Sequence, residues 1–201
     1  MNRPVRIILC LSVFIAAAVC CPGAQGEEKE ALFYERLKDN IVQCMLCPRE
    51  CVITPGKRGY CRVRQNKSGR LYSLSYAQPV AIHIDPIEKK PFFHYLPGSS
   101  SYSVATVGCN LNCKFCQNWE ISQARPEDVT AAVLSPREIV ERARLSGAKS
   151  IAFTYTEPTV FFEYMLDIAR TAKSRGLRTV MHSNGFINQE PLRSLCRYLC
   201  R

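Results

Sequence analysis

The chain has 201 residues, a net charge of +10, and 47% hydrophobic and 22% charged residues. These fractions are those of an ordinary globular protein, so they argue against a disordered chain and against a membrane protein with several spans. The length allows one domain with a real core, or one domain with a small additional module. Twelve cysteines are many for this length, so their spacing is the most informative feature of the sequence.

Residues 1–26 have the pattern of a leader or membrane anchor. The basic segment "MNRPVR" precedes the 13-residue apolar run "IILCLSVFIAAAV", and "AQG" offers small residues at a cleavage position. The run is shorter than the ~20 residues that span a bilayer, which favours a signal peptide over a transmembrane helix. The alternatives are a lipidated cysteine at Cys20 or Cys21 and a start codon placed too far upstream. The pattern of this segment suggests export or membrane association.

Residues 27–100 are expected to form an N-terminal four-cysteine module with short strands. Its first segment, "EEKEALFYERLKDN", predicts a short amphipathic helix, because its apolar residues lie near helical spacing. The cysteines follow between Gln43 and Arg64. "RLYSLSYAQPVAIHID" then alternates apolar and polar residues and predicts two short strands broken near Pro79.

Residues 101–201 alternate between strand and helix patterns. "YSVATV", "KSIAFTY" and "LRTVMHS" are short apolar segments, and an amphipathic segment follows each of them. The first of these predicted helices has Ser135 as its N-cap, Pro136 at its first position and Glu138 completing a capping box. Continuous apolar strands that alternate with helices predict an α/β fold with a parallel sheet.

Polar loops follow all three predicted strands: "GCNLNCKFC", "YTEPT" and "HSNGF". The carboxyl ends of parallel strands meet at one edge of a sheet, where such folds collect their chemistry. The sequence therefore predicts a functional site made from these three loops.

Three cysteines, Cys109, Cys113 and Cys116, stand in the first loop with the spacing C-x3-C-x2-C. A structural metal site has four protein ligands, whereas a catalytic site keeps one position open. Three thiolates can hold three irons of a 4Fe–4S cluster and leave the fourth iron without a protein ligand. The alternative is a fourth ligand from Cys196 or Cys200, which lie in the last predicted helix.

A second set, Cys44, Cys47, Cys51 and Cys61, supplies the four ligands of a closed site. Zinc, a second iron–sulfur cluster and paired disulfides are all compatible with this spacing. Seven basic side chains lie between residues 43 and 70, against one acid. They would offset thiolate charge, and without a recognition motif they are weak support for nucleic-acid binding.

The C-x3-C-x2-C loop at the end of a strand resembles the radical S-adenosylmethionine (SAM) superfamily, and Phe115 matches the aromatic residue usual before the last cysteine. The segments "CMLCPRECVITPGKRGYCRVR", "DPIEKKPFFHYLPGS", "FTYTEPTVFFEY" and "SNGFI" extend the resemblance over roughly residues 30–195. Together they are similar to the radical enzymes of the AmmeMemoRadiSam system, relatives of the pyruvate formate-lyase activating enzyme.

The resemblance implies a role for each motif. The three cysteines of the first loop would bind the 4Fe–4S cluster, and SAM would chelate its open iron. Thr156 and Glu157 of "YTEP" would hold the methionine amino group. Ser183 and Asn184 would contact the carboxylate or the ribose. His182 stands where the activating enzyme has an aspartate, which puts the cation-binding role of that position in doubt.

The fold implied by the resemblance is a partial TIM-like (β/α) barrel, with about three of the family's six β/α units and an apparent C-terminal truncation. The implied reaction is reductive cleavage of SAM to a 5′-deoxyadenosyl radical, which removes hydrogen from an unknown substrate. Such chemistry suggests a cytoplasmic protein, which conflicts with the export pattern of residues 1–26. The alternatives are a glycyl-radical-enzyme activase, a non-enzymatic iron–sulfur protein and an inactive fragment. Implied partners are a flavodoxin- or ferredoxin-type electron donor, the companion proteins of the system and, for an activase, a protein substrate.

Overall fold

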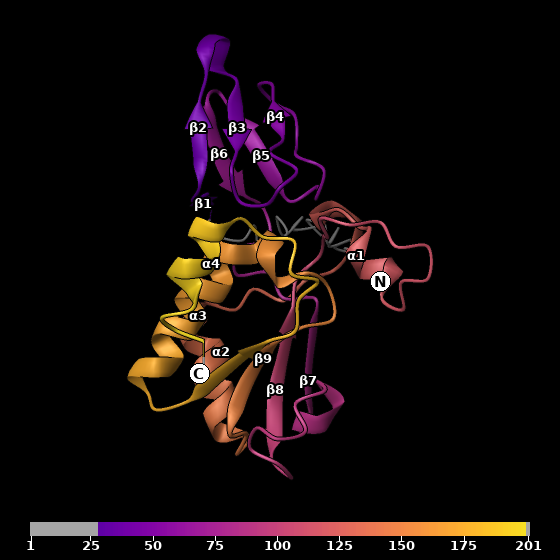
Figure 1. Ribbon diagram of the computed structural model, residues 1–201, viewed down its shortest axis with the longest axis vertical. Helices are drawn as coiled ribbons and strands as arrows, with labels where there is room; N and C mark the ends of the chain where they lie inside the picture. The colour runs from indigo at the N-terminus through magenta and orange to yellow at the C-terminus, as the bar shows by residue number, and fades with distance from the viewer. Residues whose placement is uncertain (1–27, 200–201) are drawn as a thin grey trace, which may run out of the picture.

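The computed structural model describes residues 28–199, which form a mixed α/β fold with three sheets (Figure 1). Six short strands make two small antiparallel sheets at the top of Figure 1, and the other four strands make the sheet below them. The small sheets have the orders β1-β6-β5 and β2-β3-β4. Their strands are β1 (Lys29–Glu30), β2 (Tyr34–Arg36), β3 (Val42–Cys44), β4 (Val52–Ile53), β5 (Arg64–Lys67) and β6 (Arg70–Ser73). The leader, residues 1–26, lies outside the described residues.

The predicted helix at residues 27–40 is wrong over its described part, 28–40, which instead contains β1 and β2. Each of these strands pairs antiparallel with a neighbour, β1 with β6 and β2 with β3. Phe33, between them, has a φ of 55° and sets its ring edge-on against Phe162, with 5.2 Å between the ring centroids. Pairing and packing with residues far along the chain therefore override the local helical spacing.

The larger sheet has the order β10-β9-β8-β7. Its strands are β7 (Ala81–Pro86), β8 (Ser100–Ala105), β9 (Ser150–Phe153) and β10 (Arg178–Met181). β8, β9 and β10 are parallel, at the positions predicted for buried strands, and every residue of β9 is buried. β7 is antiparallel to β8, so residues 81–86, which the sequence grouped with the four-cysteine module, extend this sheet instead.

Four α-helices accompany this sheet. They are α1 (Trp119–Ser122), α2 (Pro136–Leu145), α3 (Phe162–Ser174) and α4 (Gln189–Leu195). The predicted capping box of α2 is confirmed: the Glu138 backbone N–H donates to Ser135 Oγ at 3.3 Å, and the Ser135 N–H donates to the Glu138 carboxylate at 2.8 Å. Short 3-10 turns occupy Lys38–Asn40, Ile87–Lys89, Pro126–Asp128 and Pro158–Phe161.

One continuous core joins the small sheets to the larger one. Val42, Ile53 and Val63, from the four-cysteine region, belong to the same apolar cluster as Phe162 and Met165 of α3. Burial of these side chains fixes the four-cysteine region against the α/β sheet. The two cysteine sets are therefore held by one packed structure.

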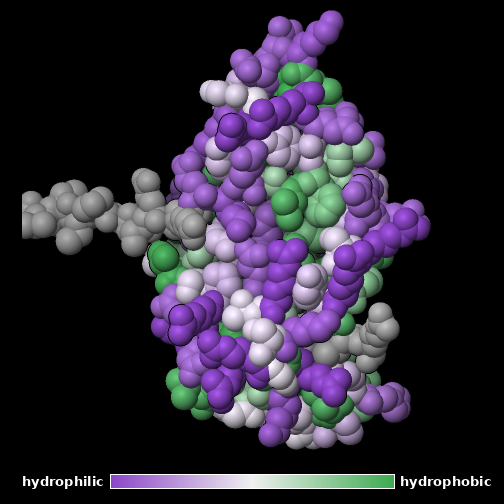
Figure 2. All heavy atoms as spheres, turned by 90° about the vertical axis from the view of Figure 1, so that its left-hand side faces the viewer, coloured by the Kyte–Doolittle hydropathy of each residue, from purple (hydrophilic) through white to green (hydrophobic). Residues whose placement is uncertain are grey.

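The surface around this core is mostly polar. The face on the left of Figure 1 carries mainly hydrophilic side chains, with several small apolar patches between them (Figure 2). Among the described residues, no helix has the length and apolar character needed to cross a membrane.

Candidate functional site

The loops after β8, β9 and β10 line one cavity of about 710 Å³, which is within the usual size range of ligand pockets. The side chains predicted for the site lie along it as follows: Cys109, Cys113 and Cys116 from the first loop, Thr156 and Glu157 from the second, and Ser183 and Asn184 from the third. Phe115 is not among the lining residues, and its side chain is 92% exposed. His182 also lines the cavity.

The cysteine loop begins with a tight backbone turn at Gly108. This residue has a φ of 97°, a conformation that favours glycine, and its N–H donates to the Ile121 carbonyl at 3.0 Å. The Leu111 N–H points at Cys109 Sγ at 3.4 Å. Cys113, in the middle of the loop, is exposed. The turn therefore delivers the three sulfurs to the cavity side of the loop, where they remain accessible.

Burial raises the pKa of Cys109, and the negative charges of Glu157, Cys116 and Cys113 raise it further. The hydrogen bond from the Leu111 N–H lowers this pKa but does not outweigh them. Without a cation, three thiolates beside a carboxylate oppose one another's ionisation. Iron bound by thiolates reverses this balance, because a metal ion keeps its ligands deprotonated. The donor set of this loop therefore fits a metal cluster.

The Glu157 carboxylate joins the second and third loops. It is 2% exposed and accepts hydrogen bonds from the Thr159 N–H at 2.9 Å, Ser183 Oγ at 2.7 Å and the Asn184 N–H at 2.8 Å. Since these donors come from both loops, Glu157 fixes their relative position as well as presenting negative charge to the cavity. A cofactor amino group would add a further donor to this carboxylate.

Asn110, which the sequence did not single out, ties the cysteine loop to the third loop. It is fully buried; its side-chain amide donates to the Phe186 carbonyl at 2.8 Å, and its Oδ1 accepts from Asn184 Nδ2 at 2.9 Å. Arg49 Nε donates to the Asn110 carbonyl at 2.6 Å. An asparagine inside C-x3-C gives no signal of this role in the sequence alone.

A hydrogen-bond network of Tyr155, Asp85 and Lys90, which the sequence did not reveal, also borders the cavity. Tyr155 has a φ of 67°, and its hydroxyl donates to Asp85 at 2.5 Å. Lys90 Nζ, on a residue that is 2% exposed, donates to Asp85 at 2.7 Å and to the Tyr155 hydroxyl at 3.0 Å. The Tyr155 carbonyl accepts from Asn118 Nδ2 at 2.9 Å, which connects this network to the cysteine loop.

Asp85 is expected to make stability pH-dependent. Burial would raise the pKa of its carboxyl, but hydrogen bonds from Lys89, Lys90 and Tyr155 outweigh burial and hold the pKa well below its usual range. A lowered folded-state pKa stabilises the protein above the unfolded value of about 3.9, and this contribution is lost as the pH falls through the folded value. Chemical denaturation of wild type and Asp85→Asn between about pH 6 and pH 2 should show that the difference between their free energies of unfolding shrinks below about pH 4. A difference that stays constant over this range would contradict the lowered pKa of Asp85.

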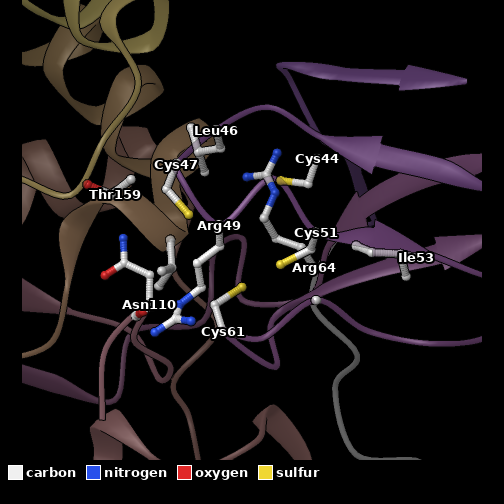
Figure 3. Close-up of a pocket in the computed structure, with 12 residues that line it drawn as sticks. Cys44, Leu46, Cys47, Arg49, Cys51, Ile53, Cys61, Arg64, Asn110 and Thr159 are labelled. Carbon is white, nitrogen blue, oxygen red and sulfur yellow. Dashed lines mark hydrogen bonds between the residues drawn. The ribbon is translucent and has the colours of Figure 1, made fainter. Parts of the chain in front are cut away.

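The four N-terminal cysteines line a separate, smaller cavity. Cys44, Cys47, Cys51 and Cys61 surround about 20 Å³ of space, and all four are free thiols (Figure 3). Burial raises the pKa of Cys61 to about 12, and burial also raises the pKa of Cys47. His83 and His94, two histidines near this part of the sequence that could have served as ligands in place of a cysteine, do not line this cavity.

Neither cysteine set is arranged around a single ion. Within residues 28–199, no three or more His, Cys, Asp or Glu side chains are positioned to hold one metal ion. A 4Fe–4S cluster distributes its thiolates over different irons. The cysteine loop at the larger cavity therefore suits a cluster better than a single metal.

Parallel strands deliver three cysteines and a buried glutamate to one cavity of an α/β domain, an arrangement that could hold a metal cluster and a cofactor with an amino group. Residues 103–201 match the family model of the Radical SAM superfamily, so this part of the chain belongs to that superfamily. The chain is 47% identical over 167 residues to the uncharacterized protein MJ0808 of Methanocaldococcus jannaschii, covering 83% of this chain and 50% of that protein.

A more distant match is 7-carboxy-7-deazaguanine synthase of Clostridium acetobutylicum, 26% identical over 93 residues, which cover 46% of this chain and 41% of that enzyme. The uncharacterized protein MJ0674 of Methanocaldococcus jannaschii is 24% identical over 169 residues, covering 80% of this chain and 44% of that protein. The chain thus spans about half the length, or less, of these curated relatives.

Proposed function

We propose that this chain carries the cluster- and SAM-binding part of a radical SAM enzyme. The observation that supports the proposal most strongly is that one cavity gathers Cys109, Cys113 and Cys116 with Glu157, Ser183 and Asn184, in the part of the chain that belongs to the superfamily. The three cysteines would hold a 4Fe–4S cluster, which would leave one iron without a protein ligand and available to the amino and carboxylate groups of SAM.

The protein's part in the reaction is to bind the cofactor, to orient it and to exclude water from it. Glu157 would accept a hydrogen bond from the methionine amino group, while Ser183 Oγ and the Asn184 N–H, which both donate to Glu157, lie beside it. Thr156 is held by its hydroxyl, which donates to the Thr106 carbonyl at 2.8 Å. When bound and reduced, the cluster supplies one electron that breaks a carbon–sulfur bond of SAM, giving methionine and a 5′-deoxyadenosyl radical that abstracts hydrogen from the substrate.

The finer assignment follows the sequence resemblance to the AmmeMemoRadiSam radical enzymes. It implies a flavodoxin- or ferredoxin-type donor for the electron and the companion proteins of that system as partners. A glycyl-radical-enzyme activase is the second candidate within the same chemistry, and it requires a protein substrate. A pull-down from the source organism with the full chain as bait tests these partners.

The test of the proposed function is formation of 5′-deoxyadenosine. The full chain is reconstituted anaerobically with iron and sulfide, reduced and given SAM. Wild type should form 5′-deoxyadenosine, and Cys113→Ala should form none, because the cluster loses one of its three thiolates. Cys196→Ala is the matched control, since Cys196 is exposed and lies outside both cysteine sets. A wild-type chain that carries its clusters and forms no product would contradict the proposal and leave an iron–sulfur electron carrier or an inactive fragment.

A further inference from the structure

The sulfurs of the four N-terminal cysteines converge on one buried space. Figure 3 shows the sulfurs of Cys47, Cys51 and Cys61 turned toward the space between them, with Cys44 beside Arg64. Leu46, Ile53 and Val160 complete the wall. The four cysteines come from separate turns and strands, so their convergence is a property of the folded chain.

The placement of the cysteines distinguishes between the candidate occupants. Four thiolates bound to one zinc ion lie about 2.3 Å from a common centre. The described residues contain no group of three or more His, Cys, Asp or Glu side chains set around one ion. The cysteines are spread as a larger inorganic core requires.

Arg64 provides a second, independent indication of an occupant. It is 1% exposed and lines the cavity, and its Nε has no hydrogen-bond partner. Its other nitrogens are used: one donates to Glu163 at 3.1 Å and one to the Leu32 carbonyl at 2.6 Å. Arg64 interacts electrostatically with Cys44 and Cys61. A buried cationic N–H without a partner, beside two of the thiols, needs an acceptor such as a metal-bound sulfur.

We propose that Cys44, Cys47, Cys51 and Cys61 bind a second 4Fe–4S cluster, with a protein thiolate on every iron. The proposal goes beyond the proposed function and stands without it. A closed cluster has no free iron for SAM or another substrate, so it suits one-electron transfer. Its net negative charge would be offset by Arg49, which also lines the cavity, while Arg64, already paired with Glu163, would contribute an N–H donor.

The two cysteine sets are neighbours across a direct backbone contact. A Cβ placed on Gly108 would lie 2.8 Å from the Cys61 carbonyl oxygen, and Gly108 immediately precedes Cys109. Arg49 spans the same boundary by donating to Asn110. The second cluster would therefore lie beside the cluster loop of the larger cavity, where an electron can pass between them.

The test is a metal and sulfide count on the full chain, purified anaerobically and reconstituted with iron and sulfide. Wild type should hold about eight irons and eight sulfides, four for each of two clusters. Cys47→Ala/Cys51→Ala and Cys113→Ala/Cys116→Ala should each keep about four. Cys196→Ala should match wild type. About four irons with one zinc, or about four irons and no other metal, in the wild-type chain would overturn the proposal.

A spectroscopic measurement on wild type covers the case in which the cysteine variants fail to fold. Electron paramagnetic resonance of the reduced protein should contain two cluster signals, and adding SAM should change only one of them. A single signal would overturn the second cluster. Two signals with neither responding to SAM would retain the second cluster and count against the proposed function, so the two failures are distinguishable.

Discussion

Arg64→Met is expected to lower the free energy of unfolding by about 3–5 kcal/mol, because it leaves a buried carboxylate without its counter-charge. The side chains of Arg64 and Glu163 are 2% and 0% exposed, and Arg64 Nη1 lies 3.1 Å from Glu163 Oε1. Arg64 also donates to the Leu32 carbonyl, and the Glu163 carboxylate accepts from the Leu32 N–H at 2.7 Å. The pair therefore fastens β5 and the segment between β1 and β2 to α3.

Chemical denaturation of the metal-free chain at neutral pH measures this effect. Arg64→Met/Glu163→Gln should be more stable than Arg64→Met, since it removes the orphaned charge and keeps an acceptor for the Leu32 N–H. Arg70→Met is the surface control, because its ion pair with Glu30 is exposed and worth about 1 kcal/mol or less. A single variant at Arg64 that is no less stable than Arg70→Met would contradict the argument.

Gly108→Ala is expected to destabilise the chain and to weaken metal binding at both cysteine sets. The φ of 97° is strained for alanine, which costs about 1–3 kcal/mol. The new Cβ would lie 2.7 Å from Val63 Cγ1 and 2.8 Å from the Cys61 carbonyl oxygen, and overpacking of this kind costs about 1–3 kcal/mol more. Since the Cys61 backbone cannot move alone, the loop that carries Cys109 should shift.

Gly98→Ala separates the two contributions. Gly98 has a φ of 72°, and nothing lies within 4 Å of an added Cβ, so this variant adds backbone strain without a clash. Thermal unfolding and iron content of both variants should show a larger loss of stability, and a loss of iron, in Gly108→Ala only. Equal losses of stability in the two variants would show that the close contact with Cys61 is unimportant.

Local signals in the sequence identified much of the α/β part. The capping box of α2 depends only on residues 135–138, and the strands β8, β9 and β10 are short apolar runs of the expected type. Because loops that follow parallel strands must meet at one edge, the position of the site could also be predicted. These features need no knowledge of distant contacts.

The features that the sequence did not reveal depend on contacts between distant residues. Arg64 and Glu163 are 99 positions apart, and Tyr155 and Asp85 are 70 apart. The segment at 28–40 has helical spacing, yet it becomes strand because β3 and β6 offer backbone partners. The sequence also assigned the two cysteine sets to separate modules, whereas the structure places Gly108 against the Cys61 carbonyl.

The 3-10 turn Pro158–Phe161 is a wall shared by both cavities. Glu157, its N-cap, lines the larger cavity, and Thr159 and Val160 line the smaller one. Binding at two sites that share a structural element is thermodynamically reciprocal. If a metal in the four-cysteine cavity raises the affinity for SAM by some factor, SAM raises the affinity for that metal by the same factor. Iron loss from the smaller cavity, followed with and without SAM, would measure that coupling directly.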